Sequence, residues 1–298
     1  MAETIKLQGT HTALATPMAN RKVDYVSLEK LVQTQIDAGI EGVLAVGTTG
    51  ESPTLSHNEH CEVIRKTVEF ANEKSLVLAG SGSNSTREAE RLSREAQDSG
   101  ADALLLVAPY YNKPTQEGLF HHFSRVAEAV EVPIILYSIP SRCGIDIGVD
   151  TCSRLYEKYP HVCAIKEAGG SCERVSQLRQ TLGHDYTILS GDDSLTVPFM
   201  SVGAKGVISV ASNVIPTEVK KMVDHANGND FQTATAIHEH FYTLFTTLFI
   251  ESNPVPVKTV LKAQGIISDE DVRLPLCPIS ESSLETLLSV TNKLGLTT

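Results

Sequence analysis

The sequence predicts an α/β fold, a (β/α)₈ barrel followed by a C-terminal helical extension. Short apolar runs recur along the chain with amphipathic stretches between them, which is the pattern of repeated βα units and a parallel sheet. The 298 residues suit one barrel with a modest extension. A doubly wound sheet would more often carry a glycine-rich dinucleotide turn, and no GxGxxG is present. We therefore expect a barrel at residues 1–226 that carries the active site, and a helical extension at 227–298.

Eight strands are expected, each a short run of apolar and β-branched residues. They span approximately residues 10–16, 42–47, 76–80, 103–107, 134–137, 162–166, 187–190 and 206–210. Helices should fill the intervals and connect the strands by right-handed crossovers. Ser56 with Glu59, and Ser85 with Glu88, have the spacing of capping boxes at helix starts. An eighth helix is expected at about 216–226.

The remainder of the chain is predicted to be helical. The expected helices span residues 231–249, 257–265 and 282–294, separated by Asn253-Pro254 and by Pro275 and Pro278. The last helix carries an apolar stripe that would pack against the barrel or against a neighbouring subunit: Leu284, Leu287, Leu288 and Leu294.

Composition and charge exclude several classes of protein. With 41% hydrophobic and 20% charged residues, the chain is neither fibrous nor disordered. The net charge of −11 disfavours nucleic acid and anionic membrane surfaces as partners. The start lacks the apolar run of an export signal, and the richest apolar run, 103–108, is too short to cross a bilayer. Six scattered cysteines without a CxxC pair suggest reduced thiols, so we expect a cytoplasmic protein.

Lys166 is the first candidate for chemistry, because barrel enzymes place their working residues at the carboxyl ends of strands. The apolar residues 162–165 would carry its ammonium to the barrel rim, and desolvation there favours the neutral amine. A neutral amine can attack a ketone, and the resulting imine is an electron sink for carbon–carbon bond chemistry. On position alone, a lysine that ends a strand and points to solvent is the commoner arrangement.

Three further turns offer groups for substrate binding. Residues 47–50, Gly-Thr-Thr-Gly, supply N–H groups and the hydroxyls of Thr48 and Thr49 for a small carboxylate, or form a simple βα turn. Tyr111 and Tyr137 could relay a proton through a threonine hydroxyl, or pack as aromatic side chains. Arg142 could bind a carboxylate with two parallel hydrogen bonds, or pair with an acidic neighbour such as Asp146.

No metal site is expected. His57 with His60, and His238 with His240, have suggestive spacings but lack a third ligand, so exposed helix faces are the better interpretation. The pair Asp192 and Asp193 lacks the companions of a magnesium site.

The motifs together resemble the dihydrodipicolinate synthase family of pyruvate-dependent class I aldolases, which also includes N-acetylneuraminate lyase. The resemblance is ordered and runs from about residue 9 to residue 262. It rests on GTTGES at 47–52, PYYNKP at 109–114, LYSIPSRCG at 136–144, IKEA at 165–168, SGDD at 190–193 and GAKGVISVASN at 203–213. Three nearby positions depart from the common pattern: Ser138, Cys143 and Gly169.

The resemblance implies a condensation of pyruvate with L-aspartate 4-semialdehyde, the first committed step of lysine and diaminopimelate biosynthesis. Lys166 would form the Schiff base, so no added cofactor is needed. Thr48 and Thr49 would hold the pyruvate carboxylate, and Arg142 would bind the semialdehyde. The other residues with an implied role are the relay groups Tyr137, Thr48 and Tyr111, and the pocket residues Gly191 and Ile208.

The resemblance also implies an assembly and an effector. Tyr111 would reach into a neighbouring subunit's site, which predicts a dimer unit arranged as a homotetramer. L-lysine would inhibit by binding a cleft at the dimer interface, where acidic and polar groups could hold its two ends. The residues expected there are Ser52, His57, His60, Asn84, Glu88 and Tyr110, with Pro53 reshaping the pocket.

Two other functions stay open from the sequence. Another pyruvate-dependent aldolase or lyase of the family would act on sialic acid or a 2-keto-3-deoxy sugar acid, although Arg142 favours the synthase. A non-catalytic barrel that binds a small acid is the alternative from a different class, since a fold alone does not guarantee catalysis.

Overall fold

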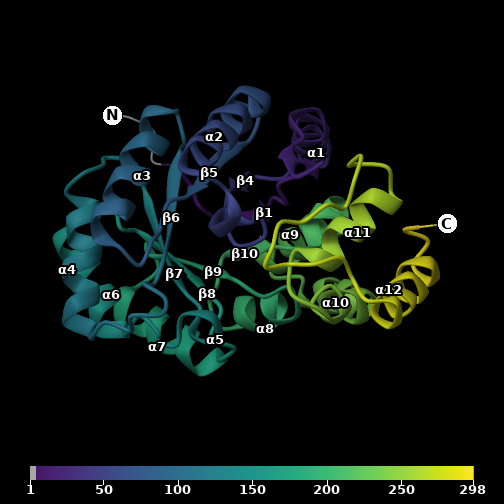
Figure 1. Cartoon of the computed structure of the whole chain (residues 1–298). Coiled ribbons are helices and arrows are strands. Elements are labelled where there is room, and N and C mark those ends of the chain that lie inside the picture. The colour runs from purple at the N-terminus through teal and green to yellow at the C-terminus, as the bar shows by residue number, and fades with distance from the viewer. Residues whose placement is uncertain (1–4, 298) are drawn as a thin grey trace.

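The computed structural model describes residues 5–297 and forms a closed barrel of eight parallel strands surrounded by helices (Figure 1). The strand order around the barrel is β1-β10-β9-β8-β7-β6-β5-β4. The strands are β1 (Gly9–Ala13), β4 (Gly42–Ala45), β5 (Leu76–Gly80), β6 (Ala103–Val107), β7 (Ile134–Ser138), β8 (Ala164–Glu167), β9 (Thr187–Ser190) and β10 (Gly206–Ser209). Each coincides with a predicted run to within a few residues, so the predicted fold class is confirmed.

The strands are recognisable in the sequence because they are buried on both faces. In β6, for example, Ala-Leu-Leu-Leu-Val is enclosed at four of its five positions. Strands of a parallel barrel face packed side chains inside and helices outside, so they are apolar throughout rather than alternating.

The helices follow the strands and cover the outside of the barrel. They are α1 (Tyr25–Asp37), α2 (His57–Ala71), α3 (Thr86–Asp98), α4 (Gln116–Ala127), α6 (Val149–Lys158), α7 (Cys172–Leu182), α8 (Thr196–Ser201) and α9 (Pro216–Asn227). Shorter helical turns lie in the loops: η1 (Ser52–Thr54), α5 (Pro140–Cys143), η2 (Asp193–Leu195) and η3 (Ala211–Asn213).

One of the two predicted capping boxes forms and the other does not. At α2, Ser56 accepts a bond from the Glu59 N–H, and the Glu59 carboxylate accepts one from the Ser56 N–H. At α3, Ser85 is the N-cap but its side chain makes no capping bond, so that prediction is wrong. The reason is that the Glu88 carboxylate is bound elsewhere, by the Ser83 hydroxyl and the His57 ring.

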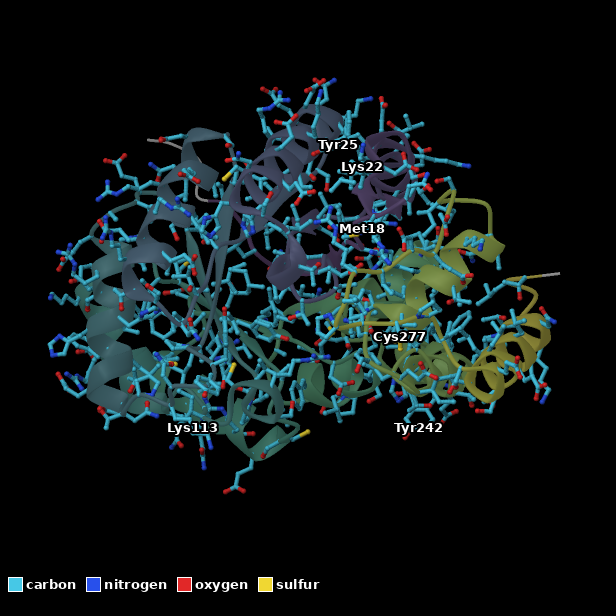
Figure 2. All side chains as sticks on the ribbon, viewed as in Figure 1. Met18, Lys22, Tyr25, Lys113, Tyr242 and Cys277 are labelled. Carbon is cyan, nitrogen blue, oxygen red and sulfur yellow. The ribbon has the colours of Figure 1, made fainter. Side chains whose placement is uncertain are left out.

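A small hairpin between β1 and α1 was not predicted. It consists of β2 (Met18–Ala19) and β3 (Lys22–Val23). Met18 is fully buried and forms a parallel bridge to Glu270, and Figure 2 shows Met18 between α1 and the C-terminal segment. The hairpin is therefore joined directly to the segment around residue 270.

The predicted C-terminal helices are present as α10 (Phe231–Thr247), α11 (Val255–Ala263) and α12 (Glu281–Lys293). They gather beside α9 on one side of the barrel (Figure 1), where α10 packs against α9 and α12. Leu287 of the predicted stripe is fully buried. The division of the chain at residue 226 stays a prediction. Between residues 5 and 297, none of the helices combines the length and the hydropathy that crossing a bilayer requires.

Candidate active site

Lys166 lies near the carboxyl end of β8 with its side chain enclosed by the barrel. Only 5% of the residue is exposed, and its Nζ atom lies 4.4 Å from the centre of the Tyr137 ring. Tyr137 is its register partner on β7. Burial lowers the pKa of Lys166 to about 8; the Asp193 carboxylate opposes this shift and the Arg142 charge adds to it. The solvent-pointing alternative is therefore excluded.

Tyr137 and Thr48 face the same interior space. They line a small cavity of about 40 Å³ together with residues of β6 and the loop after β5. Burial raises the pKa of Tyr137 to about 12, although the Arg142 charge and a hydrogen bond with Thr48 oppose this shift. The phenol consequently keeps its proton at neutral pH, and it shares this cavity with Thr48, one of the threonines singled out from the sequence.

The 47–50 turn is a closed loop with free donors. The Gly47 carbonyl accepts the N–H groups of Gly50 and Ser52, at 3.1 and 3.3 Å. A side chain at residue 50 would put its Cβ 2.9 Å from the Val46 Cα, so only glycine fits there. Within residues 5–297, the backbone N–H groups of Thr48 and Thr49 have no backbone carbonyl that accepts a hydrogen bond from them. The turn can therefore offer both N–H groups to an anion.

Two residues of the C-terminal region hold this turn in place. Asn253 donates a hydrogen bond of 3.0 Å from Nδ2 to the Thr49 hydroxyl oxygen. Lys258 of α11 donates one of 2.7 Å to Glu51, and both side chains of this ion pair are fully buried. Sequence reasoning missed both residues. The only signal was the lysine within the largely apolar run 255–261.

A larger cleft of about 390 Å³ opens beside Thr48, and Arg142 forms part of its wall. Arg142 is exposed and makes no ion pair within the described part of the chain. Asp146, its suggested partner, lies instead 3.5 Å from Arg174. Because the alternative ion pair between Arg142 and Asp146 does not form, the Arg142 guanidinium is free to bind a ligand in the cleft.

Tyr111 is not brought to the other relay residues within one chain. It is 90% exposed, and its backbone has a φ of +72°, a conformation that costs energy for a residue with a side chain. Tyr111 therefore combines a strained backbone with a solvent-facing ring, and it is not a packed aromatic side chain within its own chain.

Gly191 and Ile208 occupy different environments. A Cβ at residue 191 would lie 3.1 Å from the Cε of Lys166, so glycine leaves room beside the lysine. Ile208 is completely buried on β10.

The residues predicted to bind an effector gather on the same cleft as Thr48 and Arg142. Its walls include Ser52, His57, His60, Glu88 and Tyr110. Asn84 is attached to this wall through a hydrogen bond of 3.2 Å to the Tyr110 carbonyl.

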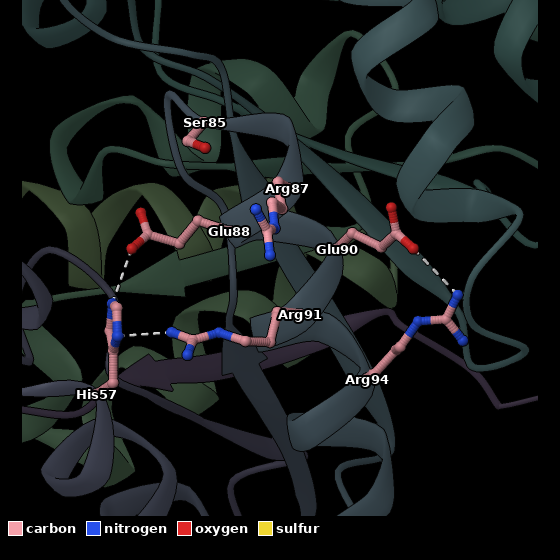
Figure 3. A pocket seen from close by; sticks show the side chains of 7 residues that line it. All are labelled: His57, Ser85, Arg87, Glu88, Glu90, Arg91 and Arg94. Carbon is pink, nitrogen blue, oxygen red and sulfur yellow. Dashed lines mark hydrogen bonds and ion pairs between the residues drawn. The ribbon is translucent and has the colours of Figure 1, made fainter.

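The outer end of this cleft adjoins a charged groove on α3, shown in Figure 3. The His57 ring donates through Nε2 to Glu88 at 2.7 Å and accepts at Nδ1 from Arg91 at 2.5 Å. Glu90 points the other way and pairs with Arg94. Ser83 and His57 hold Glu88 as an anion, since both hydrogen bonds keep its pKa below the usual value despite partial burial.

The histidine and aspartate pairs have other partners. His60 bonds to the Gly80 carbonyl at 2.9 Å, and His238 packs against the Tyr242 ring. The buried Asp193 accepts bonds from Ser209, Val210 and Ala211, and burial raises its pKa. Among the described residues, no three His, Cys, Asp or Glu side chains are grouped to hold a metal ion.

Comparison with known proteins agrees with this geometry. The model of the dihydrodipicolinate synthetase family matches residues 6–293. A 4-hydroxy-tetrahydrodipicolinate synthase from Methanocaldococcus jannaschii is 47% identical over 291 residues, which cover 97% of this chain and 99% of the relative.

Solved structures are similar over the same extent. The dihydrodipicolinate synthase from Acinetobacter baumannii, complexed with pyruvate, is 44% identical with a TM-score of 0.95 and coverage of 98% of this chain and 100% of its own. A DHDPS from Cyanidioschyzon merolae with lysine bound is 38% identical, with a TM-score of 0.94 and coverage of 97% and 98%. By family model, sequence and structure alike, the chain belongs to the dihydrodipicolinate synthetase family.

Proposed function

We propose that this protein condenses pyruvate with L-aspartate 4-semialdehyde to give 4-hydroxy-tetrahydrodipicolinate, through a Schiff base on Lys166. The observation that carries the proposal is the buried Lys166 amine against the Tyr137 ring, with a pKa lowered to about 8. At pH 7 about one-tenth of such a lysine is neutral, against about one in three thousand at its ordinary pKa. Relatives of the same length bear the name of this synthase, and one was solved with pyruvate.

Imine formation is the first step. The neutral Lys166 amine attacks the ketone carbon of pyruvate, and the bond to the carbonyl oxygen breaks as water leaves. The free N–H groups of Thr48 and Thr49 and the Thr49 hydroxyl bind the pyruvate carboxylate. The protonated Tyr137 phenol supplies a proton to the departing oxygen, and the Thr48 hydroxyl on the same cavity wall gives a path for replacing that proton.

Carbon–carbon bond formation follows from the imine. Loss of a proton from the pyruvate methyl group gives an enamine, whose carbon attacks the aldehyde of the second substrate while the aldehyde oxygen takes up a proton. The amino group of that substrate then attacks the imine carbon, closes the ring and releases Lys166 as the amine. Arg142, which has no ion-pair partner in the described chain, binds the carboxylate of the semialdehyde in the cleft beside Thr48.

Borohydride trapping tests the proposal directly. Reduction in the presence of pyruvate should leave a stable adduct on the wild-type chain, located at Lys166 by peptide mass spectrometry. Lys166→Ala should lose the adduct, and Lys205→Ala should keep it because Lys205 precedes β10 at the amino end of the strands. An adduct without turnover of the semialdehyde, but with cleavage of sialic acid or a keto-deoxy sugar acid, would indicate another member of the family. No adduct would indicate a binding protein.

The assembly that we propose is a dimer unit within a homotetramer, with Tyr111 completing the proton relay of a partner subunit. Its exposed ring and strained backbone support a role outside its own chain. Light scattering should give a mass well above the 32.2 kDa of one chain, and Tyr111→Phe should lower kcat without dissociating the assembly. A fully active monomer would contradict this assembly.

We also propose that L-lysine inhibits the enzyme from the wall of the cleft formed by Ser52, His57, His60, Asn84, Glu88 and Tyr110. The anionic Glu88 can bind the ammonium of lysine, and the shared cleft connects this wall to Thr48 and Arg142. The relative that was solved with lysine bound supports lysine as a ligand of proteins in this family.

A further inference from the structure

The hydrogen bond between Asn253 and Thr49 joins residues 204 positions apart. Asn253 lies in the loop between α10 and α11 and is 6% exposed, and Thr49 is 2% exposed. The donor is the Asn253 amide nitrogen and the acceptor is the Thr49 hydroxyl oxygen, at 3.0 Å. The C-terminal region therefore reaches the turn that we assign to the pyruvate carboxylate.

The direction of this bond decides what the Thr49 hydroxyl can do. A hydroxyl has one proton to donate and two lone pairs that accept. Asn253 donates to one of these lone pairs, and within residues 5–297 no acceptor is found for the Thr49 proton. A buried donor without an acceptor is costly, and it gains most when a ligand supplies an anionic oxygen. A donor bonded to the oxygen also polarises the O–H bond and strengthens its own donation.

A second contact fixes the same two segments relative to each other. Glu51, two residues after Thr49, is paired at 2.7 Å with Lys258, five residues after Asn253, and neither side chain is exposed. Glu51 also accepts the Arg273 N–H at 3.1 Å. Because the turn and the start of α11 are held at two points, the Asn253 amide has a defined position against the Thr49 hydroxyl.

We propose that Asn253 is a positioning residue for the 2-keto acid substrate. By donating to the Thr49 oxygen, it leaves the Thr49 proton for the substrate carboxylate, and so sets the affinity for pyruvate without touching the reacting atoms. This inference rests on the proposed function. It goes further by assigning a role in substrate binding to a residue outside the barrel strands and their loops.

The substitution Asn253→Asp tests the direction of the bond. Aspartate has nearly the same shape, but as an anion it can only accept, so it takes the Thr49 proton away from the substrate and adds a negative charge nearby. We expect the KM for pyruvate to rise about tenfold or more, in line with a lost hydrogen bond to a charged group. The KM for the semialdehyde should change little. Asn227→Asp, the same change at an exposed residue away from the turn, should alter neither.

A double-mutant cycle tests whether the effect passes through Thr49. Thr49→Val should raise the KM for pyruvate by a similar factor, and Thr49→Ser should restore it. In the Thr49→Val background, Asn253→Ala should cause little further change, because the hydroxyl that it acts on is gone. Thermal unfolding of each variant separates a loss of fold from a loss of positioning.

Each outcome bears on one proposal. If wild-type protein forms no borohydride-trapped adduct with pyruvate, the proposed function fails. If wild-type protein forms the adduct but Asn253→Asp leaves pyruvate saturation unchanged, the positioning role is overturned. It is equally overturned if Asn253→Ala has its full effect without the Thr49 hydroxyl. Should both Asn253 variants fail to fold, an unchanged pyruvate KM in Thr49→Val would still reject the role.

Discussion

The Nζ atom of Lys166 lies 4.4 Å from the centre of the Tyr137 ring, and the two residues are register partners on neighbouring strands. Burial acts on them in opposite directions, lowering the pKa of the lysine to about 8 and raising that of the tyrosine to about 12. Between these values the lysine is mainly a free amine while the phenol still holds its proton. One buried environment thus supplies a nucleophile and a proton donor side by side.

The first prediction concerns the pH dependence of imine formation. Only the neutral Lys166 amine attacks pyruvate, so the rate of adduct formation should rise as pH increases and level off above the pKa of about 8. Borohydride-trapping rates at saturating pyruvate between about pH 6.5 and about pH 9.5 would measure this. Tyr137→Phe should form the adduct more slowly, but its rate should rise with pH over the same range as in the wild type. A rate independent of pH across this range would contradict the assignment.

The same burial predicts a stability effect of Lys166. Its pKa is about 8 in the folded chain and near 10.5 when unfolded, so the unfolded state holds more protons between these values. The penalty on folding is full below pH 8 and is relieved as pH rises toward 10.5. Lys166→Met should therefore raise the Tm at pH 7 by roughly a few degrees, with a smaller gain at pH 10, while abolishing activity. An equal gain in Tm at pH 7 and pH 10, or a lower Tm at pH 7, measured by calorimetry, would contradict this prediction.

Arg142 should govern the second substrate. Arg142→Ala is expected to raise the KM for the semialdehyde, at a cost of about 1.5–3 kcal/mol in kcat/KM, the range for a hydrogen-bonded charge. Pyruvate trapping at saturation should persist. The pH above which the rate of adduct formation levels off should move to a higher value, because the Arg142 charge lowers the pKa of Lys166 in the wild type. Arg154→Ala, which removes an arginine paired with Glu117, serves as a control. Unchanged kinetics for the semialdehyde would remove Arg142 from the site.

The sequence was sufficient for the barrel because its strands are buried on both faces and are therefore apolar along their whole length. The position of Lys166 followed from its place at the end of such a strand. The hairpin at Met18 was missed because two-residue strands leave no periodic pattern. Ser85 and Glu88 have the right spacing for a capping box, yet a contact with His57 on another helix diverts the glutamate.

The support of the 47–51 turn could not be predicted from local patterns. Asn253 precedes a proline and looks like a loop residue, and Lys258 looks like a polar interruption of an apolar helix. Their partners, Thr49 and Glu51, lie more than 200 positions earlier. Only the closure of the chain around the barrel brings these pairs together.

The buried pair of Glu51 and Lys258 predicts an asymmetric stability effect. Lys258→Met leaves the Glu51 charge buried with one fewer partner, which should cost about 3–5 kcal/mol of unfolding free energy. The double variant Glu51→Gln, Lys258→Met removes both charges and should recover part of that loss. Urea unfolding monitored by circular dichroism gives both values. A double variant as unstable as the sum of its single variants would show that the two charges do not interact.

Inhibition by L-lysine is predicted to depend on Glu88. Ser83 and His57 already bind its carboxylate and keep it anionic, so lysine binding adds an ammonium to a preformed acceptor. Glu88→Gln keeps the shape but removes the charge, and should weaken lysine binding about tenfold or more. Glu90→Gln, the same change two residues along α3 on a side chain that points away (Figure 3), should leave lysine binding unaltered. Calorimetry and steady-state assays with millimolar L-lysine separate the outcomes. No inhibition of the wild type, or equal inhibition of the Glu88 and Glu90 variants, would reject this site. Lysine would then not bind on the wall of the cleft that contains Thr48 and Arg142.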